Sequence, residues 1–161
     1  MITVGVLTIS DGAAKGERQD TSGETIRALV AELPNAVIDA GAIVPDEADQ
    51  IAALLREWCD EKKLNLILTT GGTGLAPRDV TPEATKAVLE REAPGIAEAM
   101  RAISLRYTPM AMLSRGVAGV RKRTLIINLP GSPKAVKECL EYVLPTLPHA
   151  INLLVEGPKE H

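Results

Sequence analysis

The chain has 161 residues, a net charge of −3 and 45% hydrophobic residues, but only 2% aromatic residues. The hydrophobic fraction argues against a disordered chain, and the acidic balance argues against a nucleic-acid-binding module, which usually carries a basic excess. Because Trp58, Tyr107 and Tyr142 are the only aromatic residues, the core must consist mainly of aliphatic side chains. The length predicts a single domain over residues 1–161.

The compartment can be predicted from the cysteines and the apolar segments. Cys59 and Cys139 show neither metal-ligand spacing nor a disulfide framework, so we expect two reduced thiols. Residues 1–10 are typical of a strand and lack the basic start of a signal peptide. The uncharged segment 142–155 is too short to span a bilayer. We therefore expect a cytoplasmic protein with no membrane partner.

The first half of the chain alternates between strands and helices. Residues 2–9 are rich in Ile, Val and Leu and predict a buried strand. Apolar residues at helical spacing predict a helix over 23–33, with Thr21 and Glu24 as a capping box. A second strand over 37–44 and an amphipathic helix over 46–62 follow. A third strand, 64–69, leads into a glycine-rich segment.

The second half continues the alternation. A helix over 81–92 begins with Thr81 as N-cap and Pro82 as the first helical residue, and a further helix covers 94–106. Residues 110–120 predict an irregular hairpin, and 124–129 the last strand. Ser132 as N-cap and Pro133 start a helix that runs through 143, and 148–155 predict a final helical turn or two.

This order of strands and helices predicts an α/β fold with a mostly parallel sheet covered by helices on both faces. In such folds ligands bind beyond the carboxyl ends of the strands. Four loops occupy those positions and hold most of the glycine, proline and small polar residues, namely 10–12, 44–47, 69–80 and 129–134.

The glycine-rich segment follows the third predicted strand. Glycines there let backbone N–H groups turn toward an anion and let a phosphate approach closely. Neither a Walker A lysine nor the spacing of a dinucleotide-binding motif is present. By itself the segment predicts either a phosphate cradle or a tight turn, formed by Gly71, Gly72, Thr73 and Gly74.

Two aspartates stand in the selected loops. Asp79 comes just before the helix that Thr81 already caps, so it is a candidate ligand for Mg²⁺, which takes one or two carboxylates together with waters and substrate phosphates. Asp46 stands where a helix N-cap belongs, and that role alone explains an aspartate at this position. The local sequence therefore favours a metal role for Asp79 and a cap for Asp46.

Other polar residues in these loops allow two interpretations each. Ser10 and Asp11 either contact a phosphate or heterocycle or form an Asp-Gly turn. Ser132 and Lys134 either bind an anion at a helix N-terminus or form a plain capped helix. Arg78 either contacts phosphate or lies on the surface. The only basic cluster is either solvated surface or the rim of an anion site, and it consists of Arg115, Arg121, Lys122 and Arg123.

No histidine is placed to act as a general base, because His149 lies in a proline-flanked apolar segment and His161 is the last residue. A nucleophile that must be deprotonated needs a tuned base, whereas a phosphate monoester is already anionic at neutral pH. Its attack on a nucleotide phosphorus needs positioning, charge neutralisation and Mg²⁺. Glycine-loop amides, one or two carboxylates and a few basic side chains suffice for such a reaction.

Taken together, these motifs resemble the MogA/MoaB family of molybdopterin-binding proteins and the G domains of two-domain plant and animal homologues. The resemblance runs in order over nearly the whole chain, and the pairing of Thr-Thr-Gly-Gly-Thr-Gly with Arg-Asp-Val-Thr-Pro is highly specific. The matching segments are 4–11, 45–47, 69–74, 78–83, 113–115 and 129–134.

The resemblance implies a three-layer α/β/α sandwich assembled as a homotrimer. It implies transfer of AMP from Mg·ATP to the phosphate of molybdopterin with release of pyrophosphate, and a molybdate-insertion protein as a partner. It gives Asp46 and Asp79 catalytic and metal-binding roles, and the segment Gly71, Gly72, Thr73 and Gly74 the nucleotide. The molybdopterin-binding residues that it implies are Ser10, Asp11, Ser114, Pro130, Gly131 and Ser132.

Two other functions stay open. A carrier or scaffold of the MoaB type would hold molybdopterin without turnover, and loss of Asp46 or Asp79 would have favoured it, but both are present. An unrelated nucleotide hydrolase is disfavoured by the absence of a Walker lysine and of a base.

Overall fold

The computed structural model describes residues 1–157 and contains a six-stranded sheet in the order β2-β1-β3-β6-β5-β4. The first four strands in this order are parallel, and the last two are antiparallel additions at one edge. The predicted mostly parallel sheet is therefore confirmed. The strands are β1 (Ile2–Ile9), β2 (Ala36–Val44), β3 (Leu66–Thr70), β4 (Arg91–Glu92), β5 (Ala118–Arg121) and β6 (Thr124–Leu129).

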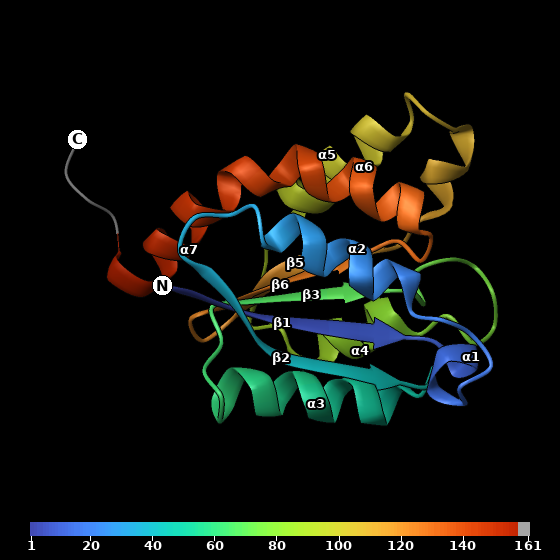
Figure 1. Cartoon of the computed structure of the whole chain (residues 1–161), viewed down its shortest axis with the longest axis horizontal. Coiled ribbons are helices and arrows are strands. Elements are labelled where there is room, and N and C mark those ends of the chain that lie inside the picture. Colours follow the sequence, from blue (N-terminus) through green and yellow to red (C-terminus); the bar gives the residue numbers. More distant parts are fainter. Residues whose placement is uncertain (158–161) are drawn as a thin grey trace.

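Helices cover both faces of the sheet, as the order of elements predicts, which makes the three-layer α/β/α sandwich that the family resemblance implies (Figure 1). One face carries α3 (Ala48–Asp60) and α4 (Thr81–Val88). The opposite face carries α2 (Thr21–Val30), α5 (Pro94–Ser104), α6 (Pro133–Val143) and α7 (Leu147–Glu156). Three short elements join these layers, namely α1 (Asp11–Ala14), η1 (Pro109–Leu113) and η2 (Leu144–Thr146).

The core has two halves because side chains alternate along each strand. In β1, Val4 and Val6 pack among α2, α5, α6 and α7, whereas Leu7 and Ile9 pack against α3 and α4. Each fully buried aliphatic side chain contributes about 1.5–3 kcal/mol to folding. The core is mainly aliphatic, as expected, and Trp58 is the one aromatic side chain buried among the described residues.

The structure corrects several predicted helix ends. Helix α2 is capped by Asp20, whose carboxylate accepts a hydrogen bond from the Gly23 amide at 2.9 Å, so the predicted capping box at Thr21 is wrong. Helix α4 ends at Val88 and not at residue 92. The chain then pairs with β5 instead, because Pro94 disfavours helical geometry at the residue before it and the edge of β5 offers backbone partners.

The last part of the described chain is more helical than predicted. Residues 147–156 form a helix, where the sequence indicated a turn or two. The expected irregular hairpin at 110–120 is divided between η1 and β5. His149 lies on α7, away from the carboxyl ends of the parallel strands, and His161, like the end of the predicted single domain, lies outside the described residues.

Two further observations concern the cysteines and the helices of the described residues. Cys59 and Cys139 are buried free thiols, and burial raises the pKa of Cys59 to about 11, so it stays protonated and unreactive. No helix within residues 1–157 combines the length and the hydropathy that crossing a bilayer requires.

Candidate functional site

Four loops meet at the carboxyl edge of the parallel strands, where the chain order reverses between β1 and β3. The hydroxyl of Thr70 donates to the Pro130 carbonyl, and that of Ser22 donates to the Gly131 carbonyl, both at 2.6 Å. Gly71 sits so close to β1 that a Cβ there would overlap the carbonyl oxygen of Ile9. The loops selected from the sequence therefore form one site at the expected edge.

The glycine segment is a tight turn that is hydrogen-bonded to the first residue of α4. Gly71 and Gly72 have φ angles of +97° and +70°, which favour glycine. The sequence predicts that Thr81 caps α4, and this is wrong. The buried Thr81 hydroxyl instead donates to the Gly71 carbonyl at 2.9 Å. A Cβ on Gly72 would overlap the Thr81 hydroxyl and lie 3.1 Å from a carboxylate oxygen of Asp46. The turn therefore places the Gly72 backbone, which carries no side chain, next to the Asp46 carboxylate.

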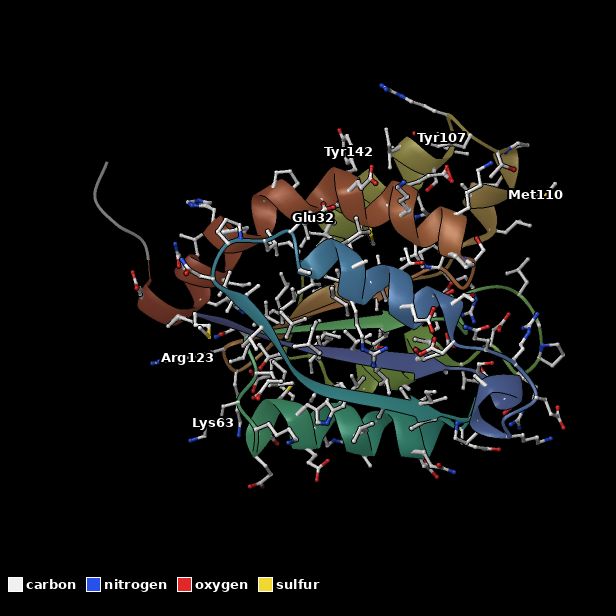
Figure 2. All side chains as sticks on the ribbon, viewed as in Figure 1. Glu32, Lys63, Tyr107, Met110, Arg123 and Tyr142 are labelled. Atoms are coloured by element: carbon white, nitrogen blue, oxygen red, sulfur yellow. The ribbon has the colours of Figure 1, made fainter. Side chains whose placement is uncertain are left out.

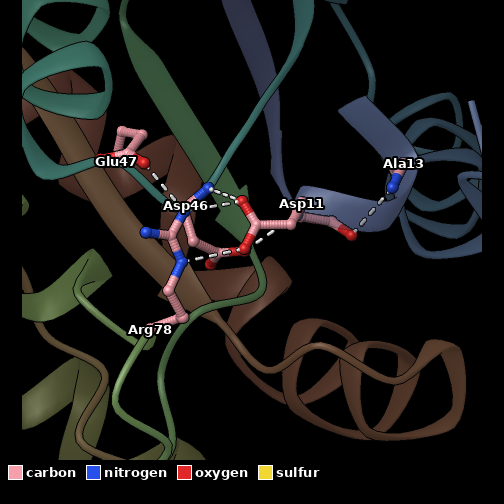
Figure 3. Close-up of polar contacts among 6 residues, drawn as sticks. Asp11, Ala13, Asp46, Glu47 and Arg78 are labelled. Atoms are coloured by element: carbon pink, nitrogen blue, oxygen red, sulfur yellow. Dashed lines mark hydrogen bonds and ion pairs between the residues drawn. The ribbon is translucent and has the colours of Figure 1, made fainter. Parts of the chain in front are cut away.

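Asp46 is not a helix cap, contrary to the interpretation of the local sequence. Helix α3 begins at Ala48, and the cap position belongs to Glu47, whose side chain makes no capping hydrogen bond. The Asp46 carboxylate instead accepts a hydrogen bond from the Asp11 amide at 2.9 Å (Figure 3). Burial raises the pKa of Asp46, and the carboxylates of Asp11 and Asp79 raise it further. Asp46 is thus a half-buried acid that faces the site.

Arg78 forms hydrogen bonds to the two loops that carry Asp11 and Glu47, and so connects three loops of the site. Its guanidinium donates to both carboxylate oxygens of Asp11, at 3.0 and 3.1 Å, and to Glu47 at 2.9 Å (Figure 3). These hydrogen bonds hold the pKa of Asp11 below its usual value. The predicted pterin ligand Asp11 therefore has both oxygens engaged by the protein. Its neighbour Ser10 caps the short helix α1 by accepting from the Ala13 amide.

Asp79 is positioned by its own loop and by Arg115. One Asp79 carboxylate oxygen accepts from the Ala76 amide at 3.0 Å. The Arg115 guanidinium donates to the backbone carbonyls of Gly74 and Asp79, both at 2.8 Å, and pairs with Glu83 at 2.6 Å. Arg115 thus supports the loop by its fork of donors.

The rest of the basic cluster lies away from these loops, so of its two interpretations the rim of an anion site is wrong for Arg121, Lys122 and Arg123. Arg121 and Lys122 pair with Asp60 at 2.9 and 3.3 Å. Figure 2 shows Lys63 and Arg123 at the end of the sheet opposite to the loops. The reason is topological, because the turn between β5 and β6 precedes the amino end of β6.

Two cavities open side by side at the loops and share Gly72, Asp79, Gly131 and Ser132. The first has a volume of about 440 Å³ and lies between α5, η1 and α6, with mainly apolar walls. The second, of about 480 Å³, has mainly polar walls and contains Asp46. The predicted residues divide between them. Ser114 and Pro130 line the first, Ser10 and Gly71 line the second, and Asp11 lines neither.

Sequence reasoning missed several side chains of this site. Asp20 lines the second cavity, accepts a hydrogen bond from the Thr8 hydroxyl at 2.9 Å and caps α2. An aspartate directly before the helix is a common cap and could have indicated this role. Asn128 donates to the hydroxyls of Thr69 and Thr85, both at 3.0 Å, beneath the first cavity. No sequence pattern indicates this role for Asn128.

The carboxylates fit an open magnesium site better than a closed metal centre. No group of three or more His, Cys, Asp or Glu side chains within the described chain could enclose a metal ion. Asp46 and Asp79 line the same cavity and are near enough for the charge of one to affect the pKa of the other. Mg²⁺ takes one or two carboxylates and completes its octahedron with water and phosphate oxygens, so this pair fits it.

Comparisons with known proteins agree with this geometry. The family described as "Probable molybdopterin binding domain" matches residues 5–149. The chain is 49% identical, over 96% of its length, to the molybdopterin adenylyltransferase of Helicobacter pylori strain J99, of which it covers 88%. It is 51% identical, over 95% of its length, to the molybdenum cofactor synthesis protein cinnamon of Drosophila melanogaster, but spans only 26% of that longer protein.

A solved structure is similar over the whole chain. The molybdopterin biosynthesis enzyme MoaB from Thermus thermophilus has a TM-score of 0.92 and 58% sequence identity, with 99% of this chain and 100% of that chain covered. The likeness includes all of the loops at the carboxyl edge of the sheet, since these lie within the covered part.

Proposed function

This chain belongs to the family of probable molybdopterin binding domains, and we propose that it is a molybdopterin adenylyltransferase of molybdenum cofactor synthesis. In the proposed reaction, a phosphate oxygen of molybdopterin attacks the α-phosphorus of ATP. The bond from that phosphorus to the bridging oxygen breaks, and pyrophosphate leaves. The near relative from Helicobacter pylori carries this activity in its name.

The observation that carries the proposal is the position of Asp79 at the junction of two cavities. A transferase must hold two substrates with their reacting phosphates together, whereas a hydrolase needs room for one substrate and water. The two cavities meet at Asp79, Gly72 and Gly131 and so offer a place for each substrate. Holding both reacting groups in one geometry is itself a large part of catalysis for such a reaction.

We assign the reacting phosphates to this junction. Asp46 and Asp79 would hold Mg²⁺, which neutralises phosphate charge when bound. The backbone of Gly71 and Gly72, which line the second cavity, would approach the nucleotide. Thr73 and Gly74, predicted for the nucleotide, line only the first cavity and are reassigned to the molybdopterin side. Helix α6 begins at Pro133 with Ser132 as its cap, so its positive end faces the junction and suits an anion.

The predicted molybdopterin-binding residues are kept in part. Ser114, Pro130, Gly131 and Ser132 line the first cavity, and we assign them to molybdopterin. Ser10 lines the second cavity and is reassigned to the nucleotide side. Asp11 is reassigned to the support of Asp46 and Arg78, because its carboxylate is engaged by Arg78 and by the Asp46 amide.

Pyrophosphate release from Mg·ATP tests the proposal, measured with and without molybdopterin. We expect release only when molybdopterin is present. Tight molybdopterin binding without release would favour a carrier or scaffold of the MoaB type. Formation of AMP or ADP in the absence of molybdopterin would indicate a hydrolase. Either of these results contradicts adenylyl transfer.

The assembly is part of the same proposal. We expect a homotrimer that passes its product to a molybdate-insertion protein. Light scattering coupled to size-exclusion chromatography measures the mass directly, and a monomeric mass at working concentration contradicts the trimer.

A further inference from the structure

One buried carboxylate oxygen of a residue that lines the first cavity has no hydrogen-bond partner in the protein. Across residues 1–157, the Oε2 atom of Glu138 is the one buried side-chain nitrogen or oxygen without a hydrogen-bond partner. Glu138 stands on α6 and lines the first cavity. Burying a carboxylate oxygen without a donor is costly, and in native proteins a water, an ion or a ligand usually supplies the donor that the protein does not.

The opposite wall of the cavity does not supply that donor. Arg101 on α5 also lines the cavity, but its guanidinium donates to the backbone carbonyls of Gly116 at 2.9 Å and Ser114 at 3.4 Å. The Ser104 hydroxyl lies 3.1 Å from the thiol of Cys139. These two polar side chains of α5 are thus engaged elsewhere, and the Glu138 oxygen is left for a ligand.

The cavity suits a flat heterocycle. Its volume of about 440 Å³ lies within the range of small-molecule sites. Ala97, Met100 and Leu113 give apolar walls, and Met110 stands exposed at its rim (Figure 2). A planar ring would be covered on its faces by these side chains, while its polar edge would have to find a hydrogen-bonding group.

A carboxylate at such an edge selects for paired donors, because its two oxygens can accept two parallel N–H bonds. The 2-amino-4-oxopyrimidine ring of a pterin presents this pair, its 2-amino group beside N3–H. Adenine presents one amino group beside the N1 lone pair, which a carboxylate repels. We propose that Glu138 binds the 2-amino and N3–H edge of the pterin and so makes the first cavity selective for molybdopterin over the nucleotide.

The position of Glu138 along α6 agrees with this orientation. Glu138 stands six residues beyond the cap Ser132, which is about 9 Å along a helix. Ser132, Gly131 and Asp79 line the same cavity near the junction. A pterin with its amino edge at Glu138 would therefore extend its phosphate-bearing side toward Asp79. This assignment rests on the proposed function, since it takes molybdopterin as the ligand.

Two variants on one helix test the assignment. Glu138→Gln keeps the shape but replaces one acceptor by an amide NH₂, which opposes the donor edge of the pterin. Glu141→Gln is the matched control, because Glu141 is on the same helix but does not line the first cavity. Among the ion pairs of the described residues, Glu141 pairs with Lys137 alone, at 3.8 Å. Both proteins are titrated calorimetrically, without oxygen, with molybdopterin and separately with Mg·ATP.

We expect Glu138→Gln to weaken molybdopterin binding about 10- to 100-fold, as for the loss of hydrogen bonds to a charged group, and to leave Mg·ATP affinity within about twofold. Glu141→Gln should change neither affinity. Competition between pterin-6-carboxylate and lumazine-6-carboxylate adds a chemical readout, because lumazine has an oxygen in place of the 2-amino group. The wild type should prefer the pterin, and Glu138→Gln should lose most of that preference.

Other results overturn the assignment. If Glu138→Gln weakens Mg·ATP binding and not molybdopterin binding, the cavity takes adenine. If neither affinity changes, Glu138 has no ligand role, and a lowered melting temperature would then show a structural one. Failure of the proposed function is distinguishable. A wild type that binds molybdopterin through Glu138 but releases no pyrophosphate contradicts adenylyl transfer and leaves this assignment standing.

Discussion

Asp11 and Asp46 exchange hydrogen bonds between the ends of neighbouring strands. The Asp11 amide donates to the Asp46 carboxylate at 2.9 Å, and the Asp46 amide donates to the Asp11 carboxylate at 3.0 Å. Arg78 neutralises one member of the pair and lowers its pKa, whereas burial raises the pKa of the other. Two adjacent acids thereby acquire different chemistry from their surroundings. Asp11 is expected to act as support and Asp46 as ligand.

Removal of the Asp79 charge should abolish turnover without unfolding the protein. In Asp79→Asn the side-chain oxygen can still accept from the Ala76 amide, so the loop keeps its shape. The charge that holds Mg²⁺ is lost, and such stabilisation contributes several kcal/mol. We expect molybdopterin-dependent pyrophosphate release to fall at least about 10²-fold. Asp39→Asn, exposed on β2, is the control, and near-normal release by Asp79→Asn would contradict the metal role.

The acid side of the activity profile should report Asp46. Because its pKa is raised in the folded protein, Asp46 binds a proton at a higher pH than an ordinary aspartate, whose pKa is about 3.9. As the pH falls, kcat/KM should therefore decline before ordinary aspartates titrate. Asp46→Asn should lose activity at every pH, yet be no less stable than the wild type near neutral pH, because it removes a half-buried charge. A large loss of stability with normal activity would show that Asp46 is structural.

Substitution of Arg115 by lysine should not be conservative. A lysine cannot reproduce the fork that reaches the carbonyls of Gly74 and Asp79 together with Glu83. Without these hydrogen bonds the loop that carries Asp79 is held less firmly, and small displacements at a reacting centre cost up to about 10²-fold in rate. We expect kcat to fall in Arg115→Lys by roughly 10-fold or more. Equal kcat values would show that the loop needs no such support.

Gly71→Ala should cost more stability than Gly16→Ala. Both glycines have positive φ, +97° and +75°, so alanine is strained at either position, at about 1–2 kcal/mol. A Cβ at Gly16 meets nothing within 4 Å, whereas at Gly71 it overlaps the backbone carbonyl of Ile9. The difference in unfolding free energy from denaturant titrations isolates the close approach of the glycine segment to β1. Equal losses would mean that backbone conformation alone requires Gly71.

The ion pair at the far end of the sheet should give a stability that disappears in acid. Hydrogen bonds from Arg121 lower the pKa of Asp60 from 3.8 to about 2. A lowered pKa means that the contribution is present above the unfolded value and is lost as the pH falls through the folded one. The melting temperature of the wild type should exceed that of Asp60→Asn near neutral pH and converge with it between 3.8 and about 2. Glu61→Gln, an exposed neighbour, should show no such trend.

Much of the fold could be predicted because periodicity depends on local sequence. Short runs rich in β-branched residues, such as Val4 to Ile9, indicate buried strands, and the βαβ order favours a parallel arrangement of these strands. Helix ends were less predictable. Thr81 is a residue type that often caps helices, but its hydroxyl donates to the Gly71 carbonyl. This partner lies ten residues earlier in the chain and competes with the local capping hydrogen bond.

The sequence by itself determined the mostly parallel sheet with helices on both faces, the edge at which the glycine-rich loops gather, and Asp79 as a candidate metal ligand, because strand composition and loop glycines are local properties, whereas the role of Asp46 came from the family resemblance. Only the tertiary structure decided the role of each polar group. It paired Asp11 with Asp46, placed Arg115 at the site and Arg121 at the opposite end, and left a buried oxygen of Glu138, a residue that lines the first cavity, without a hydrogen-bond partner. These outcomes depend on which groups meet across the fold, and hydrogen bonds and charges act only at the distances that packing sets.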